Sequence, residues 1–241
     1  MPDPYPDSPH PDDLLEATEN LAPPENEDQA LALLKKPQAP AAALEALAKN
    51  NDLMKSRKVR LRLAMHPRTP RHISVPLLRN LFTLELMRVA LHTFTPADVK
   101  RAAENVITGH IKTISSGERA TLARRASGRV AGALLLDAEP RIVAIALDNG
   151  RLTESEVVKA LMRLDVPPTS VAAICRHARW ATRHEVQIAA LQNPKTPLGA
   201  ALGFARALHP AQLEELLAGS RVPPTVADYL RKEMRLREEK E

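Results

Sequence analysis

The sequence repeats a short junction in which two kinds of helix-breaking signal stand a few residues apart. The clearest copies are Ala64-Met65-His66-Pro67-Arg68-Thr69-Pro70 and Ala190-Leu191-Gln192-Asn193-Pro194-Lys195-Thr196-Pro197, and looser copies span residues 90–96 and 33–40. Each copy runs from an apolar pair through a polar residue and a breaker to a capping residue followed by proline. Because one helix ends and another begins at each copy, the chain is constrained to many short helices.

The chemistry of the junction predicts both helix ends. A proline disfavours the α conformation of the residue before it, so Pro67 ends the preceding helix. A threonine hydroxyl accepts from backbone N–H groups at a helix start, which makes Thr69, Thr95 and Thr196 predicted N-caps. The proline that follows each threonine fits the first helical position, where its missing N–H costs nothing.

Further helix starts appear at intervals of 12 to 15 residues from Glu27 onward. Capping boxes are predicted at Ser115 with Glu118, Thr153 with Glu156 and Thr182 with Glu185. Val-Pro-Pro-Thr occurs at residues 166–169 and 222–225, and each copy opens a helix. Other helices are predicted over residues 40–50, 58–65, 70–81, 84–92, 129–136 and 140–147, and after Pro96.

Composition favours helices over strands. Only 2% of the residues are aromatic, so a core is built mainly from Leu, Ala, Val and Ile, and 21 prolines accompany only eight glycines. Pairs of short helices that cannot bury their apolar faces alone are typical of stacked repeats. We therefore predict an all-α protein, a right-handed α-solenoid of about ten to twelve short helices, in one domain over residues 29–241.

The clearest junctions resemble the asparagine-proline-x-threonine-proline turns of bacterial variant leucine-rich repeat proteins and of the wider HEAT-like helical repeats. The resemblance is carried by residues 65–70 and 191–197 and extends over residues 30–210. It implies an α-solenoid without enzymatic activity. The cysteine-bound iron–sulfur cluster of that family has no counterpart, since Cys175 is the single cysteine, and residues 107–152 depart from the motif.

The first 28 residues differ in composition from the rest. Residues 1–30 hold nine acidic side chains and no Lys or Arg, and prolines stand at positions 2, 4, 6, 9, 11, 23 and 24. This composition predicts a disordered acidic tail over residues 1–28, with at most a short helix near residues 13–21. The tail is either a solubilising extension or a segment that folds back on a basic surface.

The basic residues concentrate in the following part of the chain. Residues 53–133 contain sixteen Lys or Arg and four acidic residues, a net charge of +12. In stacked repeats such residues line one surface and suit a phosphate backbone or an acidic partner; alternatively, they only solvate an alanine-rich stack. The candidate binding residues are Lys55, Arg57, Lys58, Arg60, Arg62, Arg68, Arg71, Arg101, Arg124, Arg125 and Arg129.

The aromatic residues are too few and too scattered for the stacking platforms of single-strand binders. Most of them are interpreted as core or end-cap residues. The same scarcity disfavours a HEAT-like DNA glycosylase, for which only Trp180 is available. Trp180 is either a packing anchor between repeats or, with Arg176, Arg179 and Arg183 on one helical face, part of a small cationic patch.

Motifs of catalysis and metal binding are missing from the sequence: it contains no phosphate loop, no Gly-x-Ser-x-Gly, no His-Glu-x-x-His and no paired cysteines. His66 and His92 stand at equivalent junction positions, but adjacent repeats are about 10 Å apart, too far to share an ion, so we interpret both as turn residues. Cys175 reads as a small buried apolar residue.

These observations favour a non-enzymatic scaffold that mediates protein–protein interaction. The alternative is sequence-nonspecific nucleic-acid binding through residues 55–129. No cofactor, metal or small-molecule substrate is predicted. Without a run of about 20 apolar residues or a signal peptide, the sequence predicts a cytoplasmic protein that does not enter membranes.

Overall fold

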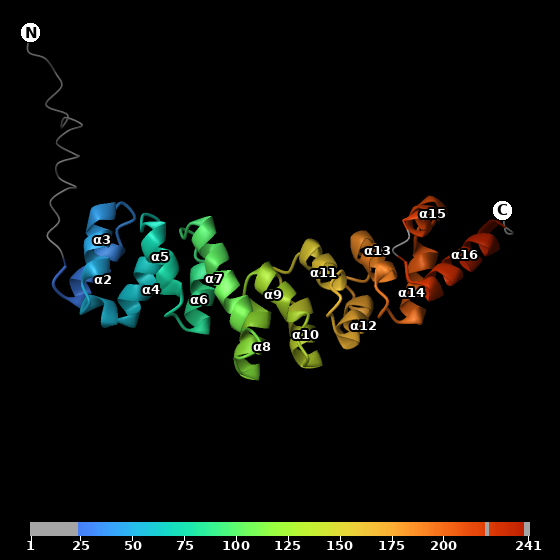
Figure 1. Ribbon diagram of the computed structural model, residues 1–241, viewed down its shortest axis with the longest axis horizontal. Coiled ribbons are helices and arrows are strands. Elements are labelled where there is room, and N and C mark those ends of the chain that lie inside the picture. Colours follow the sequence, from blue (N-terminus) through green and yellow to red (C-terminus); the bar gives the residue numbers. More distant parts are fainter. Residues whose placement is uncertain (1–23, 220–221, 239–241) are drawn as a thin grey trace, which may run out of the picture. The chain divides into compact units, whose positions relative to one another are not determined.

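The computed structural model describes residues 24–219 and 222–238, and all regular secondary structure in this part of the chain is helical (Figure 1). It contains fifteen α-helices, one short 3-10 helix and no strand. The all-α prediction is therefore confirmed. The predicted count of ten to twelve helices is too low, because thirteen of the described α-helices are only seven to ten residues long.

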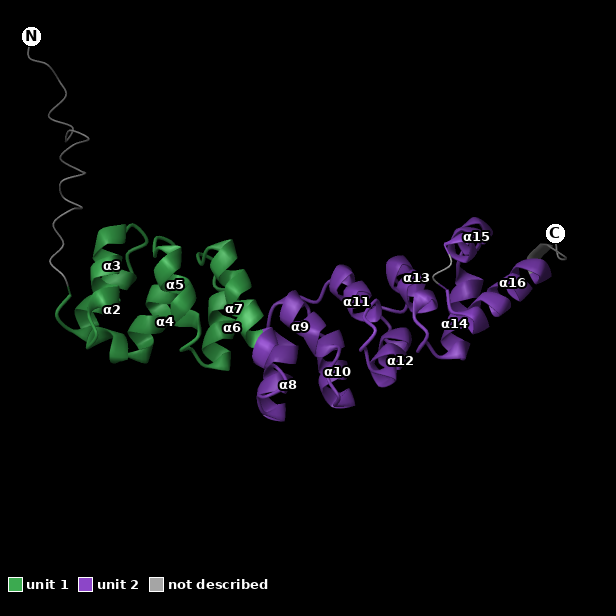
Figure 2. Ribbon diagram, in the orientation of Figure 1, with its two compact units in different colours: residues 1–107 green, residues 108–241 purple. Residues whose placement is uncertain are grey.

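The chain divides into two compact units, residues 1–107 and residues 108–241 (Figure 2). The predicted repeat domain, residues 29–241, extends over both. The predicted disordered tail, residues 1–28, and its short helix near residues 13–21 fall mainly outside the described residues. Its last residues are ordered, since Asn26 caps the first described helix by accepting from the Gln29 N–H at 2.9 Å.

Unit 1 is built from six α-helices and the 3-10 helix within the described residues. The α4 helix packs against α2, α5 and α6, and η1 packs against α3 and α4. The elements are α2 (Glu27–Leu34), α3 (Ala41–Lys49), η1 (Leu53–Lys55), α4 (Arg57–Met65), α5 (Arg71–Leu78), α6 (Thr83–Leu91) and α7 (Ala97–His110), the last turn of which passes into unit 2.

The core of unit 1 consists of small and branched aliphatic side chains, as its composition predicts. Leu33 of α2, Leu44 and Leu47 of α3, and Val59 and Leu63 of α4 are all buried in one cluster. Helices this short are marginal alone in water, so packing of their apolar faces supplies most of their stability.

In unit 2, α10 packs against α8 and α12, and α11 packs against α9 and α13, so these two helices contact the second helix before and after them along the chain. The α14 helix packs against α16 in the same way. The elements are α8 (Ser116–Arg125), α9 (Gly128–Leu134), α10 (Pro140–Leu147), α11 (Glu154–Leu161), α12 (Pro168–Arg176), α13 (His184–Gln192), α14 (Leu198–Ala207), α15 (Pro210–Ala218) and α16 (Pro224–Glu238).

Two glycines allow close packing between α9 and the start of α11. A Cβ atom on Gly128 would stand 2.3 Å from the Arg151 carbonyl oxygen, and one on Gly132 would stand 2.9 Å from the Cβ of Glu156. The first approach involves a backbone atom that cannot move aside like a side chain. Gly128 is therefore required by this packing rather than by its own backbone angles.

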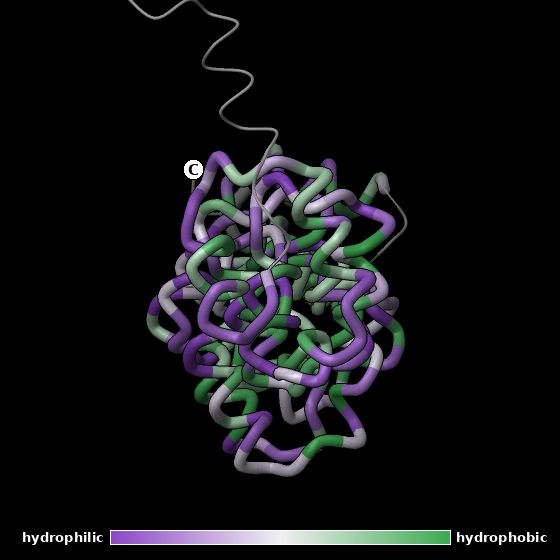
Figure 3. Tube along the Cα trace, turned by 90° about the vertical axis from the view of Figure 1, so that its left-hand side faces the viewer, coloured by the Kyte–Doolittle hydropathy of each residue, from purple (hydrophilic) through white to green (hydrophobic). Residues whose placement is uncertain are grey.

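Several predicted helix starts are confirmed. Pro168 and Pro224 each begin a helix, and Ser115 forms its capping box with Glu118. Hydrophilic and hydrophobic residues are interspersed along the trace of the described helices (Figure 3). None of the described helices has the length and apolar character needed to cross a bilayer.

Two predicted capping boxes are wrong. Thr153 is the N-cap of α11, but its hydroxyl lies 3.1 Å from the Ser155 hydroxyl instead of capping the backbone. Thr182 stands one residue too early, because α13 has Arg183 as its N-cap. In both cases a nearer hydrogen-bond partner competes with the cap.

Candidate functional site

The junctions share hydrogen bonds that join each one to an earlier helix. His66 Nε2 donates to the Lys36 carbonyl at 2.9 Å, and Asn193 Nδ2 donates to the Leu161 carbonyl at 2.6 Å. Asn149 Nδ2 donates at 2.8 Å to a carbonyl in the last turn of α8. The last carbonyls of a helix have no partner within that helix, so Asn149 and Asn193 supply partners at the ends of α8 and α11, whereas His66 bonds to the connection after α2.

The second polar atom of the same side chains fixes the turn itself. In each case this atom accepts from the backbone N–H two residues later: His66 Nδ1 at 3.2 Å, Asn149 Oδ1 at 2.7 Å and Asn193 Oδ1 at 2.8 Å. Both ring nitrogens of His66 are therefore occupied, and the ring is the Nε2–H tautomer. This supports its interpretation as a turn residue. Among the residues that the structure describes, no three metal-ligating side chains form a group.

A cation two residues later donates to carbonyl groups at the end of an earlier helix or in the connection that follows it. The Arg68 guanidinium donates to the Gln38 carbonyl at 3.0 Å, Arg151 donates to the Arg125 carbonyl at 3.3 Å, and the Lys195 ammonium donates to two carbonyls at 2.8 Å. A positive charge is favourable at a helix C-terminus, where the carbonyl dipoles point outward. Arg68, predicted to bind a ligand, therefore has a structural role.

The predicted role of the junction threonines is wrong. Thr69 Oγ1 donates back to the Leu63 carbonyl at 2.7 Å, and Thr196 Oγ1 donates back to Ala190 at 2.6 Å, while Thr95 donates to the Met65 carbonyl at 3.2 Å. The N-cap of α5 is Pro70 itself. The threonine hydroxyl ends one helix rather than starting the next, because the free carbonyls of the earlier helix lie within its reach.

Trp180 is a packing anchor. Its side chain is 1% exposed, and its indole N–H donates to the Leu147 carbonyl at 2.8 Å. The predicted patch of three arginines on one helical face is wrong, because Arg176 ends α12, Arg179 lies in the connection and Arg183 caps α13. Only Arg179 reaches the indole, with its guanidinium carbon 4.2 Å from the ring centroid.

These junctions have a short sequence signature that the proline pattern missed. Four of them read His or Asn, any residue, then Arg or Lys: residues 66–68, 149–151, 177–179 and 193–195. Asn149 lies in the stretch that lacks the proline motif, yet it makes the same hydrogen bonds. The polar donor and the cation identify a junction, and the proline is dispensable.

The junction between α6 and α7 breaks this signature. It reads His92-Thr93-Phe94-Thr95, so Phe94 stands where the other junctions have a cation. The Phe94 side chain is 68% exposed, and its ring meets the His92 ring edge-on at 6.0 Å. In the described part of the chain, His92 makes no hydrogen bond to an earlier helix.

Phe94 borders a groove within unit 1, at the ends of α2, α4 and α6. The groove has a volume of about 190 Å³. None of its lining residues, all in the described part of the chain, is acidic. The lining residues are Leu34, Lys35, Pro37, Arg62, Met65, His66, Pro67, His92 and Phe94.

The groove is electrostatically positive. Burial lowers the pKa of His92, and the positive charges of Arg62 and Lys100 lower it further. Lys35 and Arg62 are exposed on the rim. The imidazole is therefore neutral near pH 7, and an anion bound beside it would reverse the effect of the two cations.

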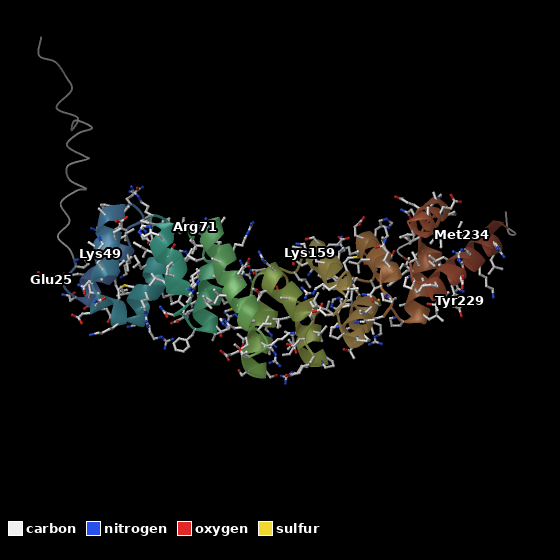
Figure 4. All side chains as sticks on the ribbon, in the orientation of Figure 1. Glu25, Lys49, Arg71, Lys159, Tyr229 and Met234 are labelled. Carbon is white, nitrogen blue, oxygen red and sulfur yellow. The ribbon has the colours of Figure 1, made fainter. Side chains whose placement is uncertain are left out.

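Several of the predicted binding residues are neutralised by acidic partners. Lys55 pairs with Asp52 at 2.8 Å, and Arg71, visible in Figure 4, pairs with Asp98 at 3.4 Å. The Arg57 guanidinium donates to Glu85 at 2.9 Å. The guanidinium carbon of Arg57 also lies 4.0 Å from the centroid of the Phe82 ring. These residues contribute less to a phosphate-binding surface than their number suggests.

The remaining predicted binding residues are divided between the two units. In unit 1, Lys58, Arg62 and Arg101 are exposed, whereas the Nε atom of Arg60 is buried without a hydrogen-bond partner in the described part of the chain. Arg124, Arg125 and Arg129 are exposed in unit 2. Arg119, in the same basic stretch, is half-buried and pairs with Asp137 at 2.8 Å and with Glu139.

The interpretation of most aromatic residues as core or end-cap residues is confirmed for the buried Trp180 and Phe204, whereas Phe82 and Phe94 are not core residues. Phe82 is 59% exposed and Phe94 is 68% exposed, whereas Phe204 is buried. Each exposed ring follows the end of a predicted helix or precedes the start of one, where the hydrophobic periodicity gives no burial signal. Tyr5 lies outside the described residues.

Cys175 is buried, as predicted. Burial raises the pKa of its thiol to about 11, so the thiol is protonated at neutral pH and chemically inert.

The chain was compared with known proteins. No family model matches it, and the comparisons with curated proteins and with solved structures also find no match.

Proposed function

We propose that this chain is a non-enzymatic helical-repeat scaffold, a right-handed α-solenoid of the HEAT-like or variant leucine-rich repeat kind, that binds a protein partner. The observation that carries the proposal is the recurring junction. Side chains at residues 66–68, 149–151 and 193–195 join helices that are 26 to 32 residues apart in sequence. Bonds of this separation are expected when each repeat stacks on the previous one.

Packing between every second helix in unit 2 supports the same proposal. The polar groups of the junctions are consumed by these internal contacts, which leaves exposed apolar side chains as the candidates for binding. Phe94 is 68% exposed and Leu164 is 91% exposed, unusual values for large apolar residues of a folded chain.

Affinity capture from the native cell tests the proposal. The tagged full-length chain should retain one protein in fixed stoichiometry, measured by native mass spectrometry of the eluted complex. Recovery of nucleic acid alone would contradict the proposal and favour the alternative.

The alternative is nucleic-acid binding through residues 55–129. It is supported by exposed cations such as Lys58, Arg62 and Arg124, for which the described residues provide no acidic partner. Binding of this kind should fall about 10³-fold or more between 50 and 200 mM salt if about six phosphates are contacted. Failure to bind a heparin column at low salt would remove this alternative.

A further inference from the structure

We propose that the groove beside Phe94 is a docking site for an acidic peptide segment of a partner protein that carries one apolar anchor residue. The inference rests on the proposed protein-binding function and assigns it a place and a ligand chemistry. The groove lies within unit 1, between the ends of α2, α4 and α6.

The groove lies at a junction that departs from the rule that four other junctions follow. Arg68, Arg151 and Lys195 each fold back onto carbonyl groups of an earlier helix. Phe94 replaces that cation, has no donor and leaves its ring 68% exposed. Phe94 therefore presents apolar surface at the edge of the groove, where an apolar side chain of a partner would bury it.

The lining matches an apolar side chain in size and character. Leu34 and Met65 form buried apolar surface, Pro37 and Pro67 add further apolar edges, and Phe94 forms one wall. A volume of about 190 Å³ is too small for most small-molecule ligands, but it accepts a single large aliphatic or aromatic side chain.

The charge of the rim selects acidic residues beside that anchor. Arg62 and Lys35 line the groove, Lys100 lies close enough to act on His92, and the lining contains no acidic residue within the described chain. Arg62 has no ion-pair partner among the described residues, unlike Arg57 on the same helix, which is held by Glu85. Lys35 and Arg62, for which the described residues provide no acidic partner, lie beside the apolar floor of the groove. They complement a peptide in which an acidic residue stands on each side of an apolar one.

A single-stranded nucleic acid fits this surface less well. Stacking platforms use several aromatic faces in succession. The other exposed ring of unit 1, Phe82, has one face covered by the Arg57 guanidinium at 4.0 Å. Phe94 alone is left, beside a recess that suits a side chain better than a row of bases.

The test uses the full-length chain and fluorescein-labelled synthetic decapeptides with one leucine among Asp and Glu. Two matched peptides replace the leucine by serine or the acidic residues by Asn and Gln. Fluorescence anisotropy should show binding of the acidic leucine peptide at least about tenfold tighter than either match, since burial of one leucine and two ionic contacts each exceed this factor. Equal affinity for the three peptides would overturn the proposal.

Substitutions locate the binding site. Phe94→Arg restores the junction signature and should keep the fold, checked by circular dichroism and thermal unfolding, while it lowers peptide affinity at least about tenfold by removing the apolar wall. Phe94→Ser should also lower the peptide affinity, and it does so without adding a charge. Leu84→Ser, at an exposed apolar residue of unit 1 outside the groove lining, is the matched control and should leave the affinity unchanged. Unchanged binding to both Phe94 variants would overturn the proposal.

Histidine NMR gives a second measurement. The His92 pKa should rise when the acidic peptide binds, because carboxylates beside the ring favour its charged form. If binding does not move the His92 signals, the peptide binds elsewhere and the proposal fails.

Two competing occupants are distinguished by the same assay. Removal of residues 1–23, which keeps the Asn26 cap of α2, should change peptide affinity by less than about threefold; a rise of tenfold or more would assign the groove to the acidic segment of this chain itself. Displacement of the peptide by a single-stranded oligonucleotide, with oligonucleotide binding lost in Phe94→Ser, would assign it to nucleic acid. Either result overturns the proposal.

The failure of this inference is separable from that of the proposed function. If the wild-type chain and Phe94→Arg capture the same stoichiometric protein partner, the scaffold function stands and the groove is not its docking site. If the wild-type chain captures no protein, the scaffold function fails, whatever the peptide assay shows.

Discussion

Two junctions of unit 1 have nearly the same sequence and end in different surfaces. The α4–α5 junction, His66-Pro67-Arg68-Thr69, places every polar side chain on an internal carbonyl or N–H. The α6–α7 junction, His92-Thr93-Phe94-Thr95, keeps only the threonine bond to an earlier helix. At the third position Arg68 donates to the Gln38 carbonyl, whereas Phe94 leaves an exposed ring beside the groove. The comparison separates residues that hold repeats together from residues that are free to bind.

The largest loss of stability is expected at the junction that contains the buried Trp180 side chain. Trp180 occupies the position that Thr69 occupies in α4–α5 and is almost fully buried. Trp180→Ala should lower the free energy of unfolding by about 3–5 kcal/mol, because it leaves a cavity and frees the Leu147 carbonyl. Thr69→Ala, which removes one buried hydrogen bond, should cost about 1 kcal/mol.

Urea unfolding followed by circular dichroism measures both costs. Trp180→Phe is the matched control, since it keeps most of the ring volume and loses the indole N–H. Equal costs for Trp180→Ala and Thr69→Ala would show that the two junctions are held by the same forces.

The next effect concerns the polar donor shared by the closed junctions. Asn149→Ala should lower the free energy of unfolding by about 2–3 kcal/mol. Two carbonyls at the end of α8 and the Arg151 N–H lose the buried side chain to which they are hydrogen-bonded. The single tryptophan, Trp180, lies in the same unit and reports its unfolding by fluorescence. Asn149→His should retain most of the stability, since histidine fills this position at His66 and His177. A stable alanine variant would mean that the donor is not needed.

A smaller effect is expected from exchanging the residues that distinguish the two junctions. Arg68→Phe removes an exposed hydrogen bond to the Gln38 carbonyl and should cost about 1 kcal/mol. Phe94→Arg should leave the free energy of unfolding unchanged or raise it by about 0.5 kcal/mol, because a cation near a helix C-terminus is favourable. The melting temperatures of the two single variants should therefore move apart. A loss of stability in Phe94→Arg would show that the exposed ring contributes to the fold.

The smallest effect is a proton equilibrium. Burial and the charges of Arg62 and Lys100 hold the His92 pKa below its usual value. Arg62→Gln should raise the pKa toward that value, measured by NMR titration of the ring, whereas Arg101→Gln is the control. Because the folded-state pKa is depressed, the stabilisation from neutral His92 is present above the unfolded pKa of about 6.5 and is lost as the pH falls through the folded pKa. A His92 pKa that does not respond to Arg62→Gln would place the ring outside the field of the groove.

Much of the local structure was predictable from the residues. The prolines at Pro168 and Pro224 begin helices, and Cys175 and Trp180 are buried, because backbone restriction and apolar burial are properties of single residues and their neighbours. The candidate site was predictable only in part. The net charge of residues 53–133 covers part of both units and did not distinguish Arg62, on the groove, from Arg57, which is held by Glu85.

The sequence by itself determined that the chain forms short helices, where most of them begin, and that no aromatic core holds them. Only the tertiary structure decided what the junction side chains do. Thr69 has two candidate partners, the N–H groups ahead and the carbonyls behind, and packing places the carbonyls within reach. His66 and Asn193 find partners about 30 residues away, a distance that no local pattern encodes. The exposure of the Phe94 ring was likewise decided by the tertiary structure, because the exposed fraction of a side chain depends on which helices pack beside it.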